Sequence, residues 1–378
     1  FTDWQEAIDN LANIGYPITE ISEDGTFICS KPEDTGGLIT KGTIAEQMLY
    51  EIGDPQAYIL PDVVCDFSDV EIDSVGKDQV LVKNAKGYKA PENYKVSLTY
   101  KEGFRGGAML TYYGIEADKK AEMFSKAAFD RARQGLRKNN IADFTETSVE
   151  IIGNESQYGE HRSIDGSREV VAKIAAKHED AVGIKILLRE ITGLGLSTPP
   201  GLSGFAGTRP KPSPVVRLFS FAIPKDEVQL KIITDGKGKD FKHKSKKSLK
   251  SEEVTRPQEP KIPKADQKEM TLVPLIQLAW GRSGDKGNKA NIGIIARSEE
   301  YYPYICKILT EDLIKDRFSH FLEGNVERFL LPGSNSINFL LHDVLGGGGI
   351  TSLRNDPQGK GYAQIILDTL IPVSKDLI

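Results

Sequence analysis

The chain has 378 residues, of which 39% are hydrophobic and 27% are charged, a composition typical of globular proteins with about two or three domains. Its formal net charge of −5, from 49 Lys and Arg against 54 Asp and Glu, argues against a general nucleic-acid-binding protein. No apolar run approaches the roughly 20 residues that a membrane-spanning helix needs. We therefore expect neither nucleic acid nor a membrane as a partner.

Cysteine and histidine are scarce and scattered. Cys29, Cys65 and Cys306 lie far apart and form no CxxC pair, so a disulfide framework is not expected. No Cys or His residues have the spacing of zinc ligands, and we predict no metal site. This cysteine usage favours a reducing compartment, which means the cytoplasm, or the mitochondrial matrix if the source is eukaryotic.

Residues 1–235 alternate between the two periodicities of regular structure. Apolar side chains recur at helical spacing over 116–138 and at every second position over 92–101. In chain order we predict a helix at 43–50 with a capping box formed by Thr43 and Glu46, a strand at 92–101, a helix at 116–138, a strand at 147–153, a helix at 166–179, and strands at 182–191, 214–223 and 227–234. Together these elements predict a larger mixed α/β (α+β) core region.

Residues 236–270 lose this periodicity. Seven basic residues come first: Lys237, Lys239, Lys242, Lys244, Lys246, Lys247 and Lys250. An acidic and Pro-rich stretch follows, and the composition as a whole is typical of a charged disordered linker. A nucleic-acid or membrane patch is the alternative interpretation, which the acidic residues that follow at once make weaker.

Residues 271–378 predict a small α+β sandwich. In order we expect a strand at 272–280, a polar glycine loop, a strand at 290–296, a helix at 299–317, strands at 325–331 and 336–342, a glycine-rich loop at 346–360, and a helix or strand at 361–371. The helix tolerates Pro303 because this residue falls in its first turn.

The polar glycine loop, residues 281–288, is the first candidate site. Arg282, Lys286 and Asn288 supply hydrogen-bond donors suited to an anionic group, and Asp285 is placed to orient Lys286 or to act as a base. The segment is no P-loop, because it lacks the GxxxxGK[ST] pattern and no helix follows it. A polar hairpin loop without function is an equally good interpretation.

The second candidate site is the run of four glycines in residues 346–360. Such a run loses much backbone entropy on folding, so a close approach or a positive φ is expected to require it. The residues expected to bind an anion here are Gly346, Gly347, Gly348, Gly349, Ser352 and Arg354, and the charge of Lys360 also favours an anion. A flexible surface connection is the alternative.

The third candidate precedes the predicted helix at 43–50. Thr35, Gly36 and Gly37 could line a pocket near the positive end of that helix. A loop followed by a well-capped helix is an equally good interpretation.

Several segments resemble one known family. Residues 35–40, 43–55 and 60–64 resemble the acyclic terpene utilisation, AtuA-like family, and residues 282–287, 290–293 and 346–360 resemble the AtuA-related C-terminal domain. The resemblance implies that 1–235 is the C-terminal part of an AtuA-like core and that 271–378 is a ferredoxin-like domain. It also implies a large N-terminal α/β region before the equivalent of Phe1, which we expect to act as a partner of these residues.

The family is associated with the breakdown of acyclic terpenes and branched acids through acyl-CoA intermediates. The resemblance therefore implies an acyl-CoA hydratase or carbon–carbon lyase, with a CoA thioester as ligand and no further cofactor. Asp285 and Lys286 are the candidate catalytic residues, and the anion-binding residues named above would hold the substrate.

Two alternatives remain open. The chain could be a non-catalytic assembly or regulatory subunit of a biotin-dependent acyl-CoA carboxylase, and both glycine-rich loops could serve only to dock 271–378 onto the core. We also expect a homo-oligomer.

Overall fold

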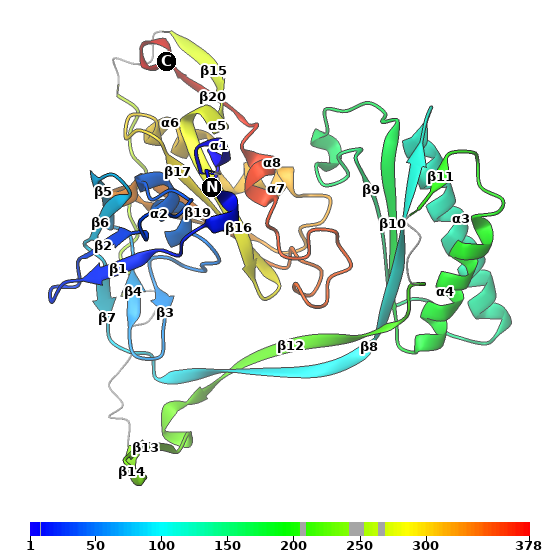
Figure 1. The fold of residues 1–378 in the computed structure, drawn as a ribbon, viewed down its shortest axis with the longest axis horizontal. Helices are drawn as coiled ribbons and strands as arrows, with labels where there is room; N and C mark the ends of the chain where they lie inside the picture. The colour runs from blue at the N-terminus through cyan, green and yellow to red at the C-terminus, as the bar shows by residue number, and fades with distance from the viewer. Residues whose placement is uncertain (8, 205–208, 242–252, 264–268) are drawn as a thin grey trace.

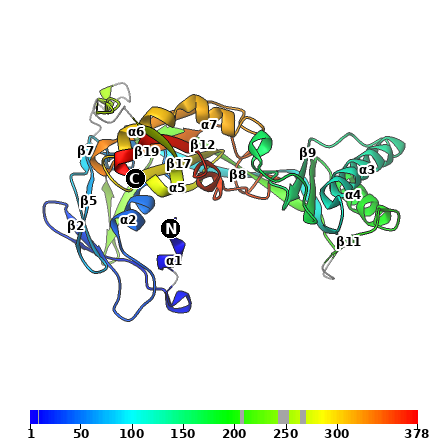
Figure 2. The ribbon, with the colours of Figure 1, turned by 90° about the horizontal axis from the view of Figure 1, so that it is seen from above.

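The computed structural model describes residues 1–7, 9–204, 209–241, 253–263 and 269–378 (Figure 1). Two bodies lie at opposite ends of the molecule, and a long two-stranded ribbon connects them (Figure 1, Figure 2). We name the two bodies by their place in the sequence. The terminal body contains both ends of the chain, and the middle body contains residues 103–204 from the middle of the sequence. The mixture of helices and strands confirms the predicted mixed α/β class.

The N-terminal part of the terminal body is mainly β-structure. Its elements are α1 (Trp4–Ala7), β1 (Ile18–Ile21), β2 (Phe27–Ser30), α2 (Lys41–Met48), β3 (Tyr58–Ile59), β4 (Val64–Asp66), β5 (Glu71–Gly76), β6 (Gln79–Lys83) and β7 (Lys86–Tyr88). One antiparallel sheet has the order β1-β2-β6-β5 and a second has the order β3-β4-β7.

The predicted helix at 43–50 is α2, but its cap lies elsewhere. Thr40 is the N-cap: its hydroxyl accepts from the Thr43 N–H at 3.3 Å, and the Thr43 hydroxyl accepts from the Thr40 N–H at 2.9 Å. Glu46 is only 1% exposed and accepts hydrogen bonds from Thr2 instead. The predicted pairing of Thr43 with Glu46 is therefore wrong, because Thr40 already supplies the capping oxygen one turn earlier.

The C-terminal part of the terminal body is a sheet covered on both faces. Its elements are β15 (Met270–Pro274), α5 (Leu275–Leu278), β16 (Ala279–Lys286), β17 (Lys289–Ala296), α6 (Tyr302–Ile308), α7 (Glu311–Arg317), β18 (Val326–Leu331), β19 (Ser336–Leu341), α8 (Tyr362–Ile366) and β20 (Leu370–Ser374). The four-stranded antiparallel sheet has the order β16-β17-β19-β18. Ile292 and Ile294 pack with the residues of α6, α7 and α8, and Ile295 packs with α2 on the opposite face.

Three predictions for this part need correction. The polar glycine loop is largely strand β16, because residues 279–286 pair with β17 along their whole length. The strand expected at 272–280 is interrupted by α5. The helix expected at 299–317 is two helices, because Thr310 begins α7 as an N-cap that accepts from the Leu313 N–H at 3.2 Å.

The middle body is one sheet with helices on one face. Its elements are the far half of β8 (Asn93–Tyr113), α3 (Ala117–Lys138), β9 (Glu146–Ile152), β10 (Glu169–His178), α4 (Ala181–Leu194) and β11 (Leu202–Ser203), and the sheet order is β11-β8-β10-β9. Apolar side chains of α3 and α4 pack against alternate residues of β8 and β10. The opposite face carries Arg105, Lys173 and Glu150.

The predicted helix at 166–179 and the predicted strand at 182–191 are both wrong. The first is strand β10. Val and Ala residues occupy both of its faces, so its sequence lacks the strict alternation of apolar and polar residues that is typical of a strand with one buried face. The second is α4, which Asp180 caps by accepting from the Val182 N–H at 2.9 Å. Its many β-branched residues resemble a strand, although the buried side chains Ile184, Leu187 and Ile191 follow helical spacing.

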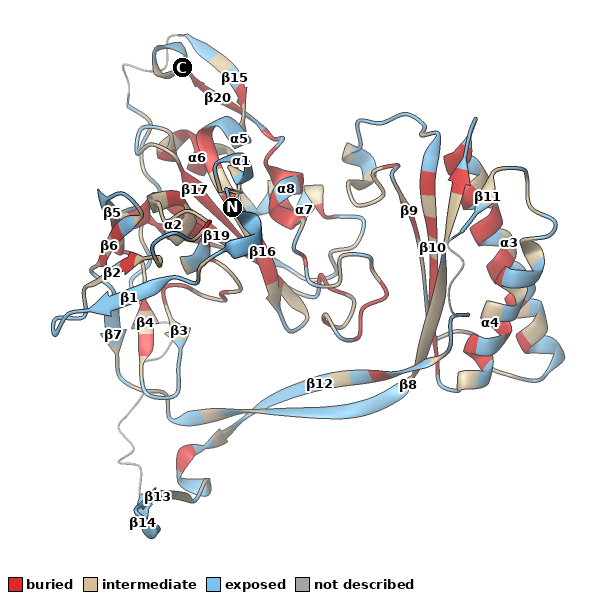
Figure 3. Cartoon of the chain, viewed as in Figure 1, coloured by how far each residue is buried: buried red, intermediate tan, exposed pale blue. Residues whose placement is uncertain are grey.

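The connecting ribbon turns its apolar face to solvent. Its strands are the near half of β8 and β12 (Ser213–Pro224), which are mostly exposed in Figure 3. Leu98 and Phe219 lie opposite each other on one face, and Phe219 is 55% exposed. Lys95 and Ser220 belong to the other face and line a cavity beside the terminal body.

The expected linker contains ordered structure. A hairpin of β13 (Leu230–Thr234) and β14 (Lys237–Phe241) occupies its start. Arg256 forms an ion pair with Asp54 at 2.7 Å, and Val254 is buried. Residues 237–241 are therefore strand β14, residues 255–263 form no helix or strand, and residues 242–252 and 264–268 lie outside the described residues. No helix within the described part of the chain is long and apolar enough to cross a membrane.

Candidate functional site

The structure brings the first two candidate segments into contact. Gly287 and Asn288 form the turn between β16 and β17, which places Asp285 and Lys286 at the end of β16. The Asn288 side chain donates to Asp343 Oδ1 at 2.9 Å and accepts from the Gly347 N–H at 2.7 Å. Asn288 therefore ties the hairpin to the glycine run that follows β19.

The glycine run is required by geometry. Gly346, Gly347 and Gly348 have φ values of +63°, +95° and +99°, which L side chains rarely adopt. A Cβ atom on Gly348 would lie 2.9 Å from the Gly287 carbonyl oxygen. The run therefore has both the positive φ and the close approach that the sequence predicts.

A cavity of about 630 Å³ opens where these segments meet the polar face of the ribbon. We call it the glycine cavity, and its lining residues are Lys95, Leu218, Ser220, Asp285, Lys286, Gly287, Asn288, Gly347, Gly348, Gly349, Ile350, Pro357 and Gln358. This volume lies within the range of small-molecule sites, and the lining combines cations, backbone groups and apolar surface.

Asp285 is paired with a lysine, but not with its neighbour in the sequence. Its Oδ1 lies 3.4 Å from the Lys360 ammonium and 3.4 Å from the Gln358 amide nitrogen. Lys360 also donates to Glu51 and to the Tyr50 hydroxyl. Lys286 lines the glycine cavity and also an adjoining cavity of about 780 Å³, and it makes no ion pair with any described carboxylate.

Lys360 and Glu51 stabilise each other's charge. The hydrogen bond from Lys360 is the main cause that lowers the pKa of the Glu51 carboxyl. Burial opposes the charge on Lys360, but its hydrogen bonds to Glu51 and Tyr50 outweigh burial and raise the pKa of the ammonium. Asp285 therefore lies beside an ammonium that remains charged at neutral pH.

Arg282 and Arg354, both expected to bind an anion, lie outside the lining of the glycine cavity. The Arg282 guanidinium lies 4.1 Å from the centre of the Tyr50 ring. Arg354 stacks on Phe321 at 4.0 Å and donates to the carbonyl groups of Phe321 and Val344. Arg354 therefore holds its own loop together.

Ser352 and the third candidate segment also make internal contacts. The buried Ser352 hydroxyl accepts from the Arg354 N–H at 3.2 Å. The Thr35 hydroxyl donates to the Pro32 carbonyl at 2.7 Å, and a Cβ atom on Gly36 would lie 2.2 Å from the Asp9 carbonyl oxygen. Gly37, at φ +89°, lies in the same loop, so this segment packs on residues 9–14 and contributes nothing to the lining of the glycine cavity.

Residues 351–355 dock the terminal body onto the ribbon and onto the middle body. The Thr351 hydroxyl donates to the Val216 carbonyl at 3.2 Å, and the Asn355 N–H donates to Glu150 at 2.7 Å. Lys173 donates to the Leu353 carbonyl. The second glycine-rich segment therefore takes part in docking. Such a role is one of the alternatives expected from the sequence, in which the glycine-rich loops dock residues 271–378 onto the core.

Sequence reasoning did not select Lys95 of the ribbon or Arg105, Glu150 and Lys173 of the middle body. Strand pairing places the last three on one face of the sheet, and hydrogen bonds join that face to residues 352–355. Lys95 becomes relevant because it lines the glycine cavity. Lys360 was selected for its basic charge, and in the structure it pairs with the carboxylates of Glu51 and Asp285.

Two family models match the chain. The model described as acyclic terpene utilisation family protein AtuA matches residues 1–234, and the model described as AtuA ferredoxin-like domain matches residues 273–372. These matches confirm the resemblance seen in the sequence and the ferredoxin-like C-terminal domain. No curated protein and no solved structure matches the chain.

Proposed function

Because the chain belongs to the acyclic terpene utilisation family AtuA, we propose that it binds an acyl-CoA intermediate of terpene or branched-acid breakdown in the glycine cavity. The observation that carries the proposal is the meeting of two glycine-rich segments, far apart in the sequence, around one cavity of about 630 Å³. Lys95 and Lys286 supply positive charge for the phosphates of CoA. Leu218, Ile350 and Pro357 supply apolar surface for the acyl group.

The same cavity holds groups suited to addition or elimination beside a thioester. The Gly347 N–H is used by Asn288, whereas the N–H groups of Gly348 and Gly349 have no acceptor within the described residues. These two donors are available to a thioester oxygen that gains negative charge. Asp285, held by Lys360 and Gln358, is the carboxylate that would take the proton from water or from the substrate.

The test is a thermal-shift series on the purified chain with free CoA, branched acyl-CoAs, the corresponding free acids and inorganic phosphate. A ligand that binds only the folded protein raises the melting temperature by mass action. We expect acyl-CoAs to raise it most and the Lys286→Ala variant to lose the shift. Lys126→Ala is the matched control, because Lys126 is exposed on α3 and its one ion pair among the described residues is with Asp130. An unchanged melting temperature with every CoA compound would contradict the proposal.

A further inference from the structure

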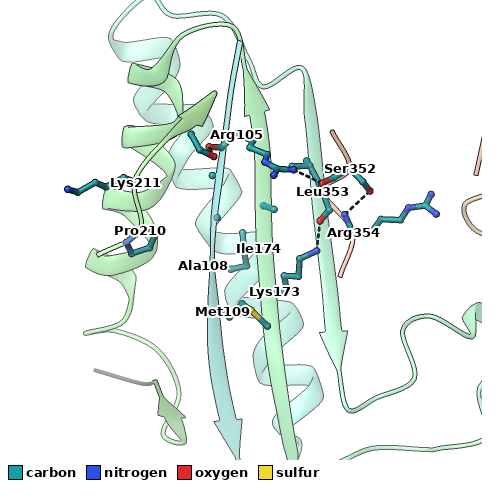
Figure 4. Close-up of a pocket in the computed structure, with 14 residues that line it drawn as sticks. Arg105, Ala108, Met109, Lys173, Ile174, Pro210, Lys211, Ser352, Leu353 and Arg354 are labelled. Carbon is teal, nitrogen blue, oxygen red and sulfur yellow. Dashed lines mark hydrogen bonds between the residues drawn. The ribbon is translucent and has the colours of Figure 1, made fainter. Parts of the chain in front are cut away.

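A second cavity, of about 470 Å³, lies between residues 352–354 and the helix-free face of the middle-body sheet (Figure 4). We call it the sheet pocket. Its lining residues are Arg105, Gly106, Gly107, Ala108, Met109, Lys173, Ile174, Ala175, Pro210, Lys211, Ser213, Ser352, Leu353 and Arg354. None of the candidate roles argued from the sequence involves the two strands that form its floor.

The lining of the sheet pocket is positively charged. It contains Arg105, Lys173, Lys211 and Arg354 and, within the described part of the chain, no carboxylate. Figure 4 shows Arg105 and Lys173 reaching toward the 352–354 segment, whereas the Lys211 and Arg354 side chains extend away. The charge that faces the pocket is therefore mainly that of Arg105 and Lys173.

The two cations differ in their partners: Lys173 forms an ion pair with Glu150, whereas Arg105 forms none with any described carboxylate. Arg105 donates to the Ser352 carbonyl at 3.1 Å, which satisfies one donor of a guanidinium that has five. Burial lowers the pKa of Lys173, the hydrogen bond to Glu150 opposes this shift, and repulsion by Arg354 and Arg105 adds to it. A bound anion would relieve that repulsion.

The floor of the pocket is apolar and hollow. Gly107 leaves space above the sheet, and no larger residue can replace it, because a Cβ atom there would lie 2.1 Å from the Ile174 carbonyl oxygen. Ala175 is small, and Met109, two residues beyond Gly107 on β8, is 57% exposed. An apolar surface of this kind beside two cations is suited to an amphipathic molecule.

We propose that the sheet pocket binds a small carboxylate with an aliphatic body. The carboxylate lies between Arg105 and Lys173, and the aliphatic body covers Gly107, Met109 and Leu353. Arginine suits this role because its planar fork can bind both oxygens of a carboxylate. The proposal uses no residue of the lining of the glycine cavity, so either one can fail alone.

The methionines provide a direct test. The chain has four: Met48, Met109, Met123 and Met270. With the methionine methyl groups labelled with carbon-13, octanoate is titrated into the full chain, and octanol and inorganic phosphate are titrated separately. We expect octanoate to shift the Met109 signal to saturation and to leave the exposed Met123 on α3 unchanged.

Octanol and phosphate separate the two halves of the proposed ligand. We expect each to need at least about tenfold higher concentration than octanoate, because each supplies only the body or only the charge. The proposal would be overturned if octanoate did not change the chemical shift of the Met109 methyl group, or if octanol changed it at the same concentration as octanoate.

Two variants locate the binding site. Arg105→Gln keeps an N–H donor for the Ser352 carbonyl but removes the charge, and we expect octanoate to bind at least about tenfold more weakly. Ala175→Leu fills the floor without changing any charge, and we expect the Met109 response to disappear. Arg137→Gln, at an exposed position on α3, is the matched control. Unchanged octanoate affinity in either pocket variant would refute the assignment.

Discussion

The glycine cavity and the sheet pocket both border the segment 346–360, and both carry positive charge, but they differ in what the charge faces. In the glycine cavity Lys95 and Lys286 stand near the carboxylate of Asp285 and near backbone N–H groups. In the sheet pocket Arg105 and Lys173 face an apolar floor with no carboxylate in the lining, within the residues the structure describes. Of the two, the first combines a carboxylate with backbone N–H donors, which are the groups that the proposed addition or elimination needs.

The two cavities also differ in how their cations are held. Arg105 and Lys173 each donate to a carbonyl of the docking segment, so their removal affects the contact between the two bodies. Lys286 makes no such contact, and its removal is expected to affect binding alone. We therefore expect substitutions of Arg105 and Lys173 to change stability, and substitution of Lys286 to change ligand binding with little effect on stability.

The largest expected effect is on stability and comes from Lys173→Met. Glu150 is only 7% exposed, and this change leaves its carboxylate without the ammonium that neutralises it. Removing one partner of a buried ion pair destabilises a protein by about 3–5 kcal/mol. Urea denaturation measures the loss, with Lys126→Met as the exposed control. A loss below about 1 kcal/mol would show that the pair does not hold the two bodies together.

The second prediction concerns Asp285 in the glycine cavity. Asp285→Asn keeps the shape of the side chain and removes its basicity, so we expect turnover of the acyl-CoA substrate to fall by about 100-fold or more. Binding of acyl-CoA in the thermal-shift series should change little, because the cations Lys95 and Lys286 remain. Full turnover by a folded Asp285→Asn variant would exclude Asp285 as the base.

The third prediction separates contact from backbone strain at Gly348. Gly348→Ala puts a Cβ atom 2.9 Å from the Gly287 carbonyl oxygen, so the glycine run must move away from the hairpin. We expect acyl-CoA to bind about tenfold more weakly, which corresponds to about 1.4 kcal/mol. Gly236→Ala is the matched control, because Gly236 also has a positive φ, of +76°, but no neighbour within 4 Å. Equal loss of affinity in both variants would contradict a local effect at the cavity.

Part of this arrangement can be predicted from the sequence, and the reason lies in the range of the interactions. The four consecutive glycines predict positive φ values, and the periodicity over 116–138 correctly predicts α3. Both succeed because each signal depends on neighbouring residues in the sequence. The assignment of β10 failed because apolar residues on both of its faces hide the alternation, and that of α4 failed because its β-branched residues resemble a strand. Tertiary packing overrode local propensity there.

The site residues show the same limit. Arg282 and Arg354 have the chemistry of anion-binding residues, yet one lies over Tyr50 and the other is occupied by carbonyl groups near its own loop. A sequence does not reveal whether a guanidinium is already satisfied by backbone oxygens. Arg105 and Lys173 were missed for the complementary reason, because only strand pairing places them on the same face of the sheet.

The smallest expected effect is a pH dependence at the edge of the glycine cavity. Lys360 lowers the pKa of Glu51 in the folded protein, so ionised Glu51 contributes stability that is fully present above its unfolded pKa of about 4.3. This contribution is lost as the pH falls through the lower, folded pKa. We therefore expect Glu51→Gln to melt at a lower temperature than the unmodified chain at pH 7, and the gap to close as the pH falls below about 4. Thermal melts of both proteins from pH 7 to pH 3 measure that gap. A gap that stays constant over this range would mean that Glu51 contributes through packing and not through its charge. In that case the hydrogen bond to Tyr50, and not the pair with Glu51, would position Lys360 beside Asp285.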